Sequence, residues 1–344
     1  MSRSQSVDTV RSIAMITIIA AHTSAFDPQG SSNNETYWAL GTAVNQVARF
    51  TMPFFFAISG YFFGVNVRCG GNAVCLAHSR AKRIGLVFLS WCLLYLLPYN
   101  LAAIYEFGAL GPIKVAYWNI LELSQDPVLL LMQGTKGHLW FLVAMICAVY
   151  ISAVFIQRGM IKSLLAIAAL FYVVGVLAKA YANTPIGLGL EFNTRNGPFF
   201  SLLPFASGYC ISGLKVDARW LWYGAILFSL GLAVHFVEVY VLWRYYETSP
   251  RQDYVFASYL AGMGVAISSL SQHKLLQRDA LSKIGRLSLG IYVVHIVFVD
   301  NLRVIDSIIH SALWDIVYIF LVLGLSVASV LLSAKNRYAK HIVI

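Results

Sequence analysis

Long apolar runs separated by short polar segments dominate the chain. A membrane-spanning helix needs about 20 mostly apolar residues, and ten stretches approach this length. The ninth stretch is short for a span, and the longest intervening loops lie near 27–49 and 105–137. The pattern predicts an all-α, polytopic membrane protein with about ten transmembrane helices. The ten predicted spans lie near 7–26, 50–67, 84–104, 138–156, 163–181, 196–214, 220–243, 254–271, 287–302 and 312–334.

The composition supports this prediction. The chain has 344 residues, of which 59% are hydrophobic and 12% are charged, and its mean hydropathy is +0.70. A soluble domain of this length needs more polar surface. No small-residue cleavage site follows the first apolar run, so we expect a retained first span rather than a cleaved signal. We also expect one transmembrane domain over residues 1–344, because no intervening segment is long enough for a separate soluble domain.

The distribution of basic residues explains the net charge of +10. If the N-terminus is cytoplasmic, the inner segments hold 16 lysines and arginines and the outer segments hold seven. This bias is typical of multi-pass proteins, whose cytoplasmic loops are the more positive. An even number of spans then predicts that both termini are cytoplasmic, and no nucleic-acid partner is expected. The seven outer residues are Arg49, Lys114, Lys136, Arg195, Arg244, Arg251 and Arg303.

The first predicted span carries three ionisable groups, Asp8, Arg11 and His22. Arg11 and His22 are 11 residues apart, close to three helical turns, so they share a face and lie about 16 Å apart along the axis. Asp8 lies one turn before Arg11. In a structural interpretation, Asp8 pairs with Arg11 and His22 bonds a neighbouring helix. In a functional interpretation, the stripe lines a polar cavity from the inner face to beyond the membrane centre.

Polar residues also mark the predicted outer ends of the second and fourth spans. Arg49 opens the second span, and the Ser59–Gly60 pair within it is small enough to permit close helix packing. His138 and Trp140 lie at the outer end of the fourth span. Trp140 alone is typical of an interface anchor.

Two further groups lie nearer the predicted inner face. Arg80, Lys82 and Arg83 occupy a predicted loop just before the third span, where they either orient the chain against anionic lipids or bind a phosphate-rich ligand. Tyr292 and His295 belong to the ninth span, and His295 is expected about two turns from the inner face.

Five motifs follow one another along the chain in a distinctive order. In order and spacing they resemble the membrane acyltransferase 3 family over essentially the whole chain. The motifs are the Arg11–His22 pair in VDTVRSIAMITIIAAH, MPFFFAISGYFFG at 52–64, HSRAKRI at 78–84, HLWFL at 138–142 and SLGIYVVH at 288–295.

The resemblance implies a multi-pass enzyme of the bacterial inner membrane. It implies acetyl-CoA as the donor, entering from the cytoplasm, with no permanently bound cofactor. The acceptor is a hydroxyl of a surface polysaccharide or lipid-linked glycan on the outer side. His22 is a general base or an acyl carrier, and direct transfer and an acyl-histidine relay both stay open. The implied roles are catalytic for His22, Arg11 and Asp8, donor-binding for Arg80, Lys82, Arg83, Ser59, Tyr292 and His295, and acceptor-side for Arg49, His138, Trp140 and Arg195.

Two other classes of protein stay open at this point. A transporter of a glycan-lipid or acylated substrate also places ionisable groups at membrane depth, although no repeat of one half by the other is evident. A membrane glycosyltransferase usually needs clustered carboxylates, and the outer segments have no tight acidic motif. No metal site is expected, because the spacing of Cys69, Cys75 and His78 matches no zinc pattern.

Overall fold

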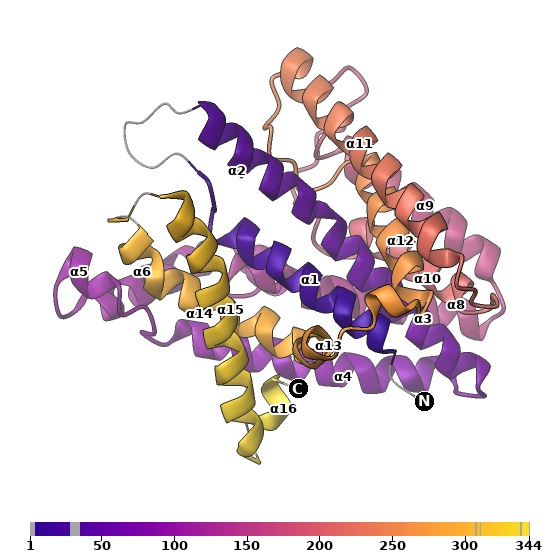
Figure 1. The fold of residues 1–344 in the computed structure, drawn as a ribbon, viewed down its shortest axis with the longest axis horizontal. Helices are drawn as coiled ribbons and strands as arrows, with labels where there is room; N and C mark the ends of the chain where they lie inside the picture. Colours follow the sequence, from indigo (N-terminus) through magenta and orange to yellow (C-terminus); the bar gives the residue numbers. More distant parts are fainter. Residues whose placement is uncertain (1–3, 28–34, 307, 310, 338, 344) are drawn as a thin grey trace. The chain divides into compact units, whose positions relative to one another are not determined.

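The computed structural model describes residues 4–27, 35–306, 308–309, 311–337 and 339–343. Within these ranges every regular element is a helix and no strand occurs (Figure 1), so the all-α prediction is confirmed. The chain forms two compact units, each built from several separate segments. The two units are described in turn.

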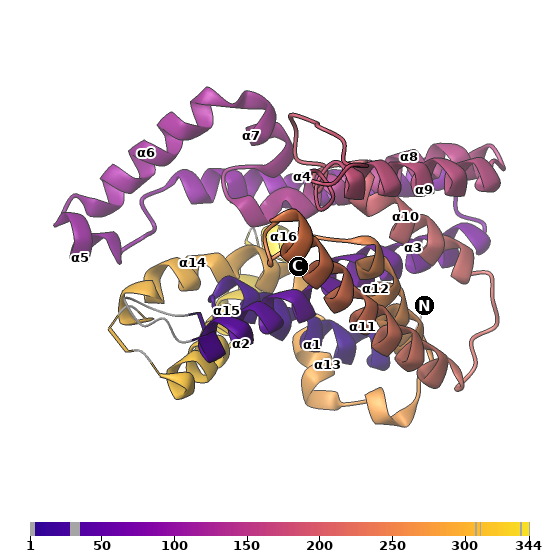
Figure 2. The same ribbon diagram turned by 90° about the horizontal axis from the view of Figure 1, so that it is seen from above.

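The first unit comprises Met1–Val7, Arg49–Gly85 and Trp140–Gln277. Its central helix is α10, which packs against α3, α8 and α9, while α11 and α12 lie side by side (Figure 1, Figure 2). Aromatic side chains such as Phe56, Phe200 and Phe205 fill its core. Its elements are η1 (Ala48–Phe50), α3 (Thr51–Arg68), the first half of α4 (Ala73–Leu96), α8 (Trp140–Gln157), α9 (Ile161–Leu177), α10 (Pro198–Ile211), α11 (Trp220–Tyr246), α12 (Phe256–Leu270) and η3 (Lys274–Leu276).

A carboxylate inside α11 joins this helix to α12. Glu238 accepts hydrogen bonds from the backbone N–H groups of Phe256 and Ala257, at 2.9 and 3.0 Å. These N–H groups belong to the first turn of α12, where no intrahelical acceptor exists. The hydroxyl of Tyr181 donates to the same carboxylate at 2.9 Å. The carboxyl group of Glu238, in an otherwise apolar helix, therefore accepts its hydrogen bonds from the first turn of α12 and from Tyr181.

Small residues set the distance between α3 and α10. A Cβ atom on Gly60 would overlap the backbone carbonyl of Phe205, and one on Gly208 would overlap the carbonyl of Ala57. The two backbones therefore touch where both helices lack a side chain, as in small-residue interfaces of membrane helices. The predicted close packing at Gly60 is confirmed.

This contact predicts the effect of enlarging Gly60. Gly60→Ala should lower the free energy of unfolding by about 2 kcal/mol, because the added methyl group forces α3 and α10 apart. Unfolding in mixed detergent micelles measures the change. Gly85→Ala is a matched control, since no atom lies within 4 Å of the Cβ position there and alanine favours a helix more than glycine does. A destabilisation by Gly85→Ala equal to that by Gly60→Ala would contradict the packing explanation.

The second unit comprises Asp8–Ala48, Leu86–Leu139 and Arg278–Ile344. Here α14 packs against α15 and α16. The helices α5, α6 and α7 follow α4 and precede η2 in the chain, and Figure 2 shows these three helices next to one another. Its elements are most of α1 (Gln5–His22), α2 (Glu35–Val47), the second half of α4, α5 (Ala103–Phe107), α6 (Gly111–Gln125), α7 (Pro127–Gln133), η2 (Gly137–Leu139), α13 (Asp279–Gly285), α14 (Ser288–Asp306), α15 (Ala312–Lys335) and α16 (Lys340–Val343).

A helix overlaps each of the ten predicted spans. Five helical segments among the described residues are long and apolar enough to cross a membrane, which is consistent with a multi-pass membrane protein. Three further apolar helices, α9, α10 and α12, are shorter. The count of ten spans and the cytoplasmic termini stay predictions. The five long segments are Glu35–Arg68, Gly137–Gln157, Trp220–Tyr246, Ser288–Asp306 and Ala312–Lys335.

Four local predictions were wrong. The basic segment before the third span is helical, because α4 starts at Ala73 and contains Arg80, Lys82 and Arg83; alanine, lysine and arginine are strong helix formers. That helix ends at Leu96 rather than near residue 104, since Pro98 cannot continue it.

The other two wrong predictions concern loop content and helix length. The predicted loops 27–49 and 105–137 hold α2 and most of α5 to α7. The ninth helix is also longer than predicted and runs to Asp306.

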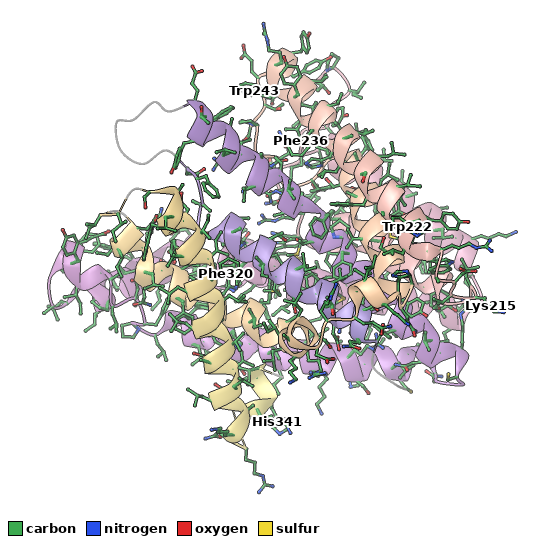
Figure 3. The ribbon with its side chains drawn as sticks, viewed as in Figure 1. Lys215, Trp222, Phe236, Trp243, Phe320 and His341 are labelled. Carbon is green, nitrogen blue, oxygen red and sulfur yellow. The ribbon has the colours of Figure 1, made fainter. Side chains whose placement is uncertain are left out.

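Large apolar side chains cover outward faces of both units. On α11, Trp222 and Trp243 are 60% and 38% exposed, and on α15 Phe320 is 55% exposed (Figure 3). A water-soluble surface rarely carries such contiguous apolar side chains. In a membrane protein these faces contact lipid.

Candidate active site

Three histidines from distant parts of the sequence meet in the second unit. The ring centroids of His22 and His295 lie 5.0 Å apart, those of His138 and His295 lie 5.4 Å apart, and those of His22 and His138 lie 6.3 Å apart. All three pairs meet edge to face. We refer to His22, His138 and His295 as the histidine cluster.

Each histidine occupies a defined position in its element. His22 is the last residue of α1, and the chain turns sharply beyond it through Ser24 and Phe26, which adopt positive φ angles of 52° and 63°. His138 lies in the short helix η2, just before α8, and His295 lies in α14. The rings therefore meet because His22 ends α1, His138 lies just before α8 and His295 lies within α14.

The members of the cluster differ in exposure. His138 and His295 are buried, with 6% and 0% of their surfaces exposed, whereas His22 is only partly buried. His22 is thus the most exposed member of the cluster, and the two rings that it contacts are buried.

The hydrogen bonds of His295 fix its tautomer. Its Nδ1 lies 2.7 Å from the carbonyl oxygen of Tyr292, and since a carbonyl only accepts, Nδ1 carries the proton and donates. Nε2 of the neutral ring then holds the lone pair. The Nε2 atoms of His295 and His138 are both buried, and neither has a hydrogen-bond partner among the described residues.

Two tyrosines hold the ring of His138. The ring of Tyr95 meets it edge-on at 5.4 Å, and the Tyr95 hydroxyl donates to the carbonyl of Val293 at 2.7 Å. The Tyr292 hydroxyl donates to the backbone carbonyl of His138. The second half of α4 and the start of α14 are therefore both tied to the segment that carries His138.

An ion pair fastens the same segment to α14 a second time. Nζ of Lys136 lies 2.8 Å from Oδ2 of Asp300, and the Tyr99 hydroxyl donates to the same carboxylate oxygen. Lys136 precedes His138 by two residues, and Asp300 follows His295 by five. The ion pair thus fixes the two histidine-bearing segments relative to each other.

Asp8 and Arg11 pair near the start of α1. Nη1 of Arg11 lies 3.0 Å from Oδ1 of Asp8, so the predicted pairing is confirmed. The backbone of Asp8 lies so close to Gly285 that a Cβ there would overlap the Asp8 carbonyl. Arg11 itself is partly exposed, with 26% of its side chain accessible. The pair lies toward the opposite end of α1 from His22.

The residues predicted to bind the donor fall in two places. Arg80 lies in the first unit, where its Nη1 donates to the Ser59 carbonyl at 3.2 Å and its guanidinium lies 5.1 Å from the Phe63 ring centroid. Lys82 and Arg83 are exposed on α4.

Tyr292 and His295, in contrast, belong to the histidine cluster and its surroundings. The predicted depth of His295, about two turns from the inner face, stays a prediction.

The residues predicted on the acceptor side gather in the first unit around Asp253. Its Oδ1 lies 3.1 Å from Nη1 of Arg195 and 3.4 Å from Nη1 of Arg49, and its Oδ2 lies 3.0 Å from Nζ of Lys179. The guanidinium of Arg195 also covers the Trp140 ring at 5.0 Å. We call Arg49, Lys179, Arg195 and Asp253 the cationic cluster. His138, predicted with this group, lies instead in the histidine cluster.

Asp253 stays ionised in this surrounding. Burial alone would raise the pKa of its carboxyl group, but the charges of Arg195, Arg49 and Lys179 outweigh burial and lower the pKa from 3.8 to about 2. The cationic cluster therefore holds one negative and three positive charges at neutral pH.

Several residues of these clusters were not predicted. Asp300, Lys136, Tyr95 and Tyr99 surround the histidines, and Asp253 centres the cationic cluster. One signal was available, because Asp300 is a lone acid inside a predicted span, where such a residue usually has a partner or a function.

Comparison with known proteins identifies the family. A family model described as an acyltransferase domain matches residues 4–334, nearly the whole chain. The chain belongs to this acyltransferase family. The acyltransferase is also 29% identical, over 218 residues, to an amino-acid racemase of Enterococcus faecalis. That match covers 60% of the acyltransferase but only 28% of the racemase, so the chain spans less than a third of that relative. No solved structure matches.

A residue that removes the proton of an acceptor hydroxyl in acyl transfer must present a proton-accepting atom. Within the described ranges, no three histidine, cysteine, aspartate or glutamate residues are arranged to hold a metal ion. The histidine cluster brings three imidazoles together, and imidazole is the side chain that most often removes a proton from a reacting hydroxyl. It is therefore the candidate active site.

Proposed function

We propose that this acyltransferase moves an acetyl group from cytoplasmic acetyl-CoA to a hydroxyl of a surface polysaccharide or lipid-linked glycan outside the bacterial inner membrane. Family membership supports acyl transfer, and the predicted topology supports a donor and an acceptor on opposite sides. The identity of the acyl group as acetyl, and of the acceptor as a glycan, follows from the resemblance of the sequence motifs.

The proposal rests on one partly exposed imidazole, that of His22, which contacts the two buried imidazoles of His138 and His295. His22 is reachable, and its ring rests against His295 at 5.0 Å. A general base must lie within hydrogen-bond reach of the proton it removes. His22 is partly exposed, so a hydroxyl can approach it, and the two buried rings beside it restrict its position.

The reaction is balanced without any further reagent. His22 takes the proton of the acceptor hydroxyl while the hydroxyl oxygen attacks the thioester carbonyl carbon. The tetrahedral intermediate collapses, the carbon–sulfur bond breaks, and the imidazolium returns the proton to the departing thiolate. The products are an O-acetyl ester and CoA with a free thiol.

A relay through the protein would use the same residue differently. His22 would attack the thioester itself, releasing CoA, and the acetyl-imidazole would then pass its acetyl group to the glycan hydroxyl. The intact mass of the protein after exposure to acetyl-CoA alone distinguishes the two routes, because only the relay leaves an acetyl group on the protein.

The donor's phosphates fit the exposed cations of α4. Lys82 and Arg83 are exposed in the first half of α4, the part that the charge bias predicts to be cytoplasmic. Lysine binds phosphate as a point charge and arginine binds it through paired N–H groups. Arg80 donates a hydrogen bond to the Ser59 carbonyl of α3, so its proposed role is to hold α4 in place and thereby position Lys82 and Arg83.

A gene deletion tests the proposed function. Surface glycans of a deletion strain should lack O-acetyl groups by mass spectrometry, and the wild-type gene should restore them. His22→Ala, expressed at the same level in the membrane, should not restore them. Glycans that keep their acetyl groups after deletion would reject this function.

A further inference from the structure

The cationic cluster occupies one end of the helices of the first unit. Arg49 lies in η1, two residues before α3, Arg195 and Asp253 lie three residues before α10 and α12, and Lys179 lies two residues after α9. These side chains contact one another, so they bring the four segments together.

The charges in this cluster do not balance. Asp253 already pairs through both carboxylate oxygens, with Arg49 and Arg195 on one and Lys179 on the other. The four side chains keep a formal charge of +2 after this pairing.

The cluster is accessible to a ligand. Its four side chains are between 20% and 26% exposed, which leaves room for contact from outside. Asn196, next to Arg195, is only 7% exposed, and its Oδ1 has no hydrogen-bond partner among the described residues.

We propose that the cationic cluster binds an anionic sugar residue of the acceptor glycan, with its carboxylate or phosphate on Arg195 and Arg49. This inference rests on the proposed function and adds the charge of the substrate to it. Arg49 and Arg195 belong to segments predicted on the outer side, where the glycan is met. Trp140, which Arg195 covers, follows His138 of the histidine cluster by two residues in the sequence.

Binding of small sugars to the purified protein tests the inference without acyl transfer. In phosphatidylcholine nanodiscs, a saturation-transfer NMR titration compares D-glucuronate with D-glucose, which differ at one carboxylate. Glucuronate should bind at least tenfold more tightly than glucose, and added salt should weaken its binding. Equal binding of the two sugars would overturn the inference.

Variants assign the binding to the cluster. Arg195→Gln should weaken glucuronate binding at least tenfold, and Arg195→Lys, which keeps the charge and the ion pair, should weaken it less. Arg244→Gln is the matched control, since Arg244 lies over the Tyr245 ring outside the cluster, and its binding should equal that of the wild type. Unchanged binding in Arg195→Gln would overturn the inference.

Further measurements identify the source of the anion and distinguish this inference from the proposed function. Glucose 6-phosphate should compete with glucuronate if the cluster accepts either anion of a sugar. If only nanodiscs with phosphatidylglycerol stabilise the wild type over Arg195→Gln, and glucuronate does not bind, the cluster is a lipid site and the inference fails. Acetyl transfer to a neutral glycan without any preference for glucuronate would overturn this inference while leaving the proposed function intact.

Discussion

Replacing His22 with alanine should lower the rate of acetyl transfer by about 10³-fold, the contribution of a positioned general base. The acceptor hydroxyl would then lose the group that takes its proton, and His138 and His295 are too deeply buried to replace it. Binding of acetyl-CoA should stay within about twofold of the wild type, because the exposed cations of α4 are unchanged. Steady-state release of the CoA thiol in the presence of acceptor glycan measures the rate.

A second histidine provides a matched control for this substitution. His235 is as deeply buried as His295, but it lies in α11 of the first unit, where its Nδ1 pairs with the Ser258 hydroxyl at 3.1 Å. His235→Ala should keep the transfer rate within a few-fold while lowering stability. A rate for His22→Ala within tenfold of the wild type would contradict a catalytic role for His22.

Replacing Asp300 with asparagine should lower kcat by about tenfold to 100-fold with little change in the KM for acetyl-CoA. The substitution breaks the ion pair with Lys136, and a lost charge-assisted hydrogen bond is worth about 1.5–3 kcal/mol. The segment bearing His138 would then move relative to His295, and small displacements of positioned groups cost rate rather than affinity. Kinetic measurement of both constants tests this positioning role.

Two further variants define the effect of Asp300. Asp300→Glu keeps the charge and should recover part of kcat, and Lys136→Gln added to Asp300→Asn should cost little beyond the single change, because the pair acts as a unit. Asp306→Asn on the same helix is the control, since Asp306 accepts a hydrogen bond from the Trp314 indole away from the histidines. Additive losses from Lys136 and Asp300 would argue against the ion pair as the cause.

Much of the fold could be predicted from hydrophobic pattern. Apolar runs located a helix in every predicted span, and the pairing of Asp8 with Arg11 follows from their spacing of one turn. Helix ends were harder to predict, because Pro98 and the positive φ angles of Ser24 and Phe26 act locally within otherwise apolar sequence. The helices α5 to α7, of 5, 15 and 7 residues, were missed because no apolar run of about 20 residues, the length of a span, marks them.

The candidate site could be predicted only in part. His22 was recognisable as an imidazole inside an apolar helix, and Arg49, Arg195 and Trp140 were correctly grouped. The contact of His295 with His22 and His138, and the ion pair between Lys136 and Asp300, join residues more than 150 positions apart. Spacing within one helix carries no information about such pairs, so they required the structure.

The central claim is that an acetyl group passes from a donor on one side of the membrane to a hydroxyl on the other. Vesicles that contain the protein, with radiolabelled acetyl-CoA inside and glycan from the deletion strain outside, test it most directly. Transfer across the membrane predicts label in the external glycan as an alkali-labile ester, unlabelled CoA retained inside, and no transfer by His22→Ala. Labelled acetyl-CoA that leaves the vesicles without ester formation would contradict transfer and indicate a transporter.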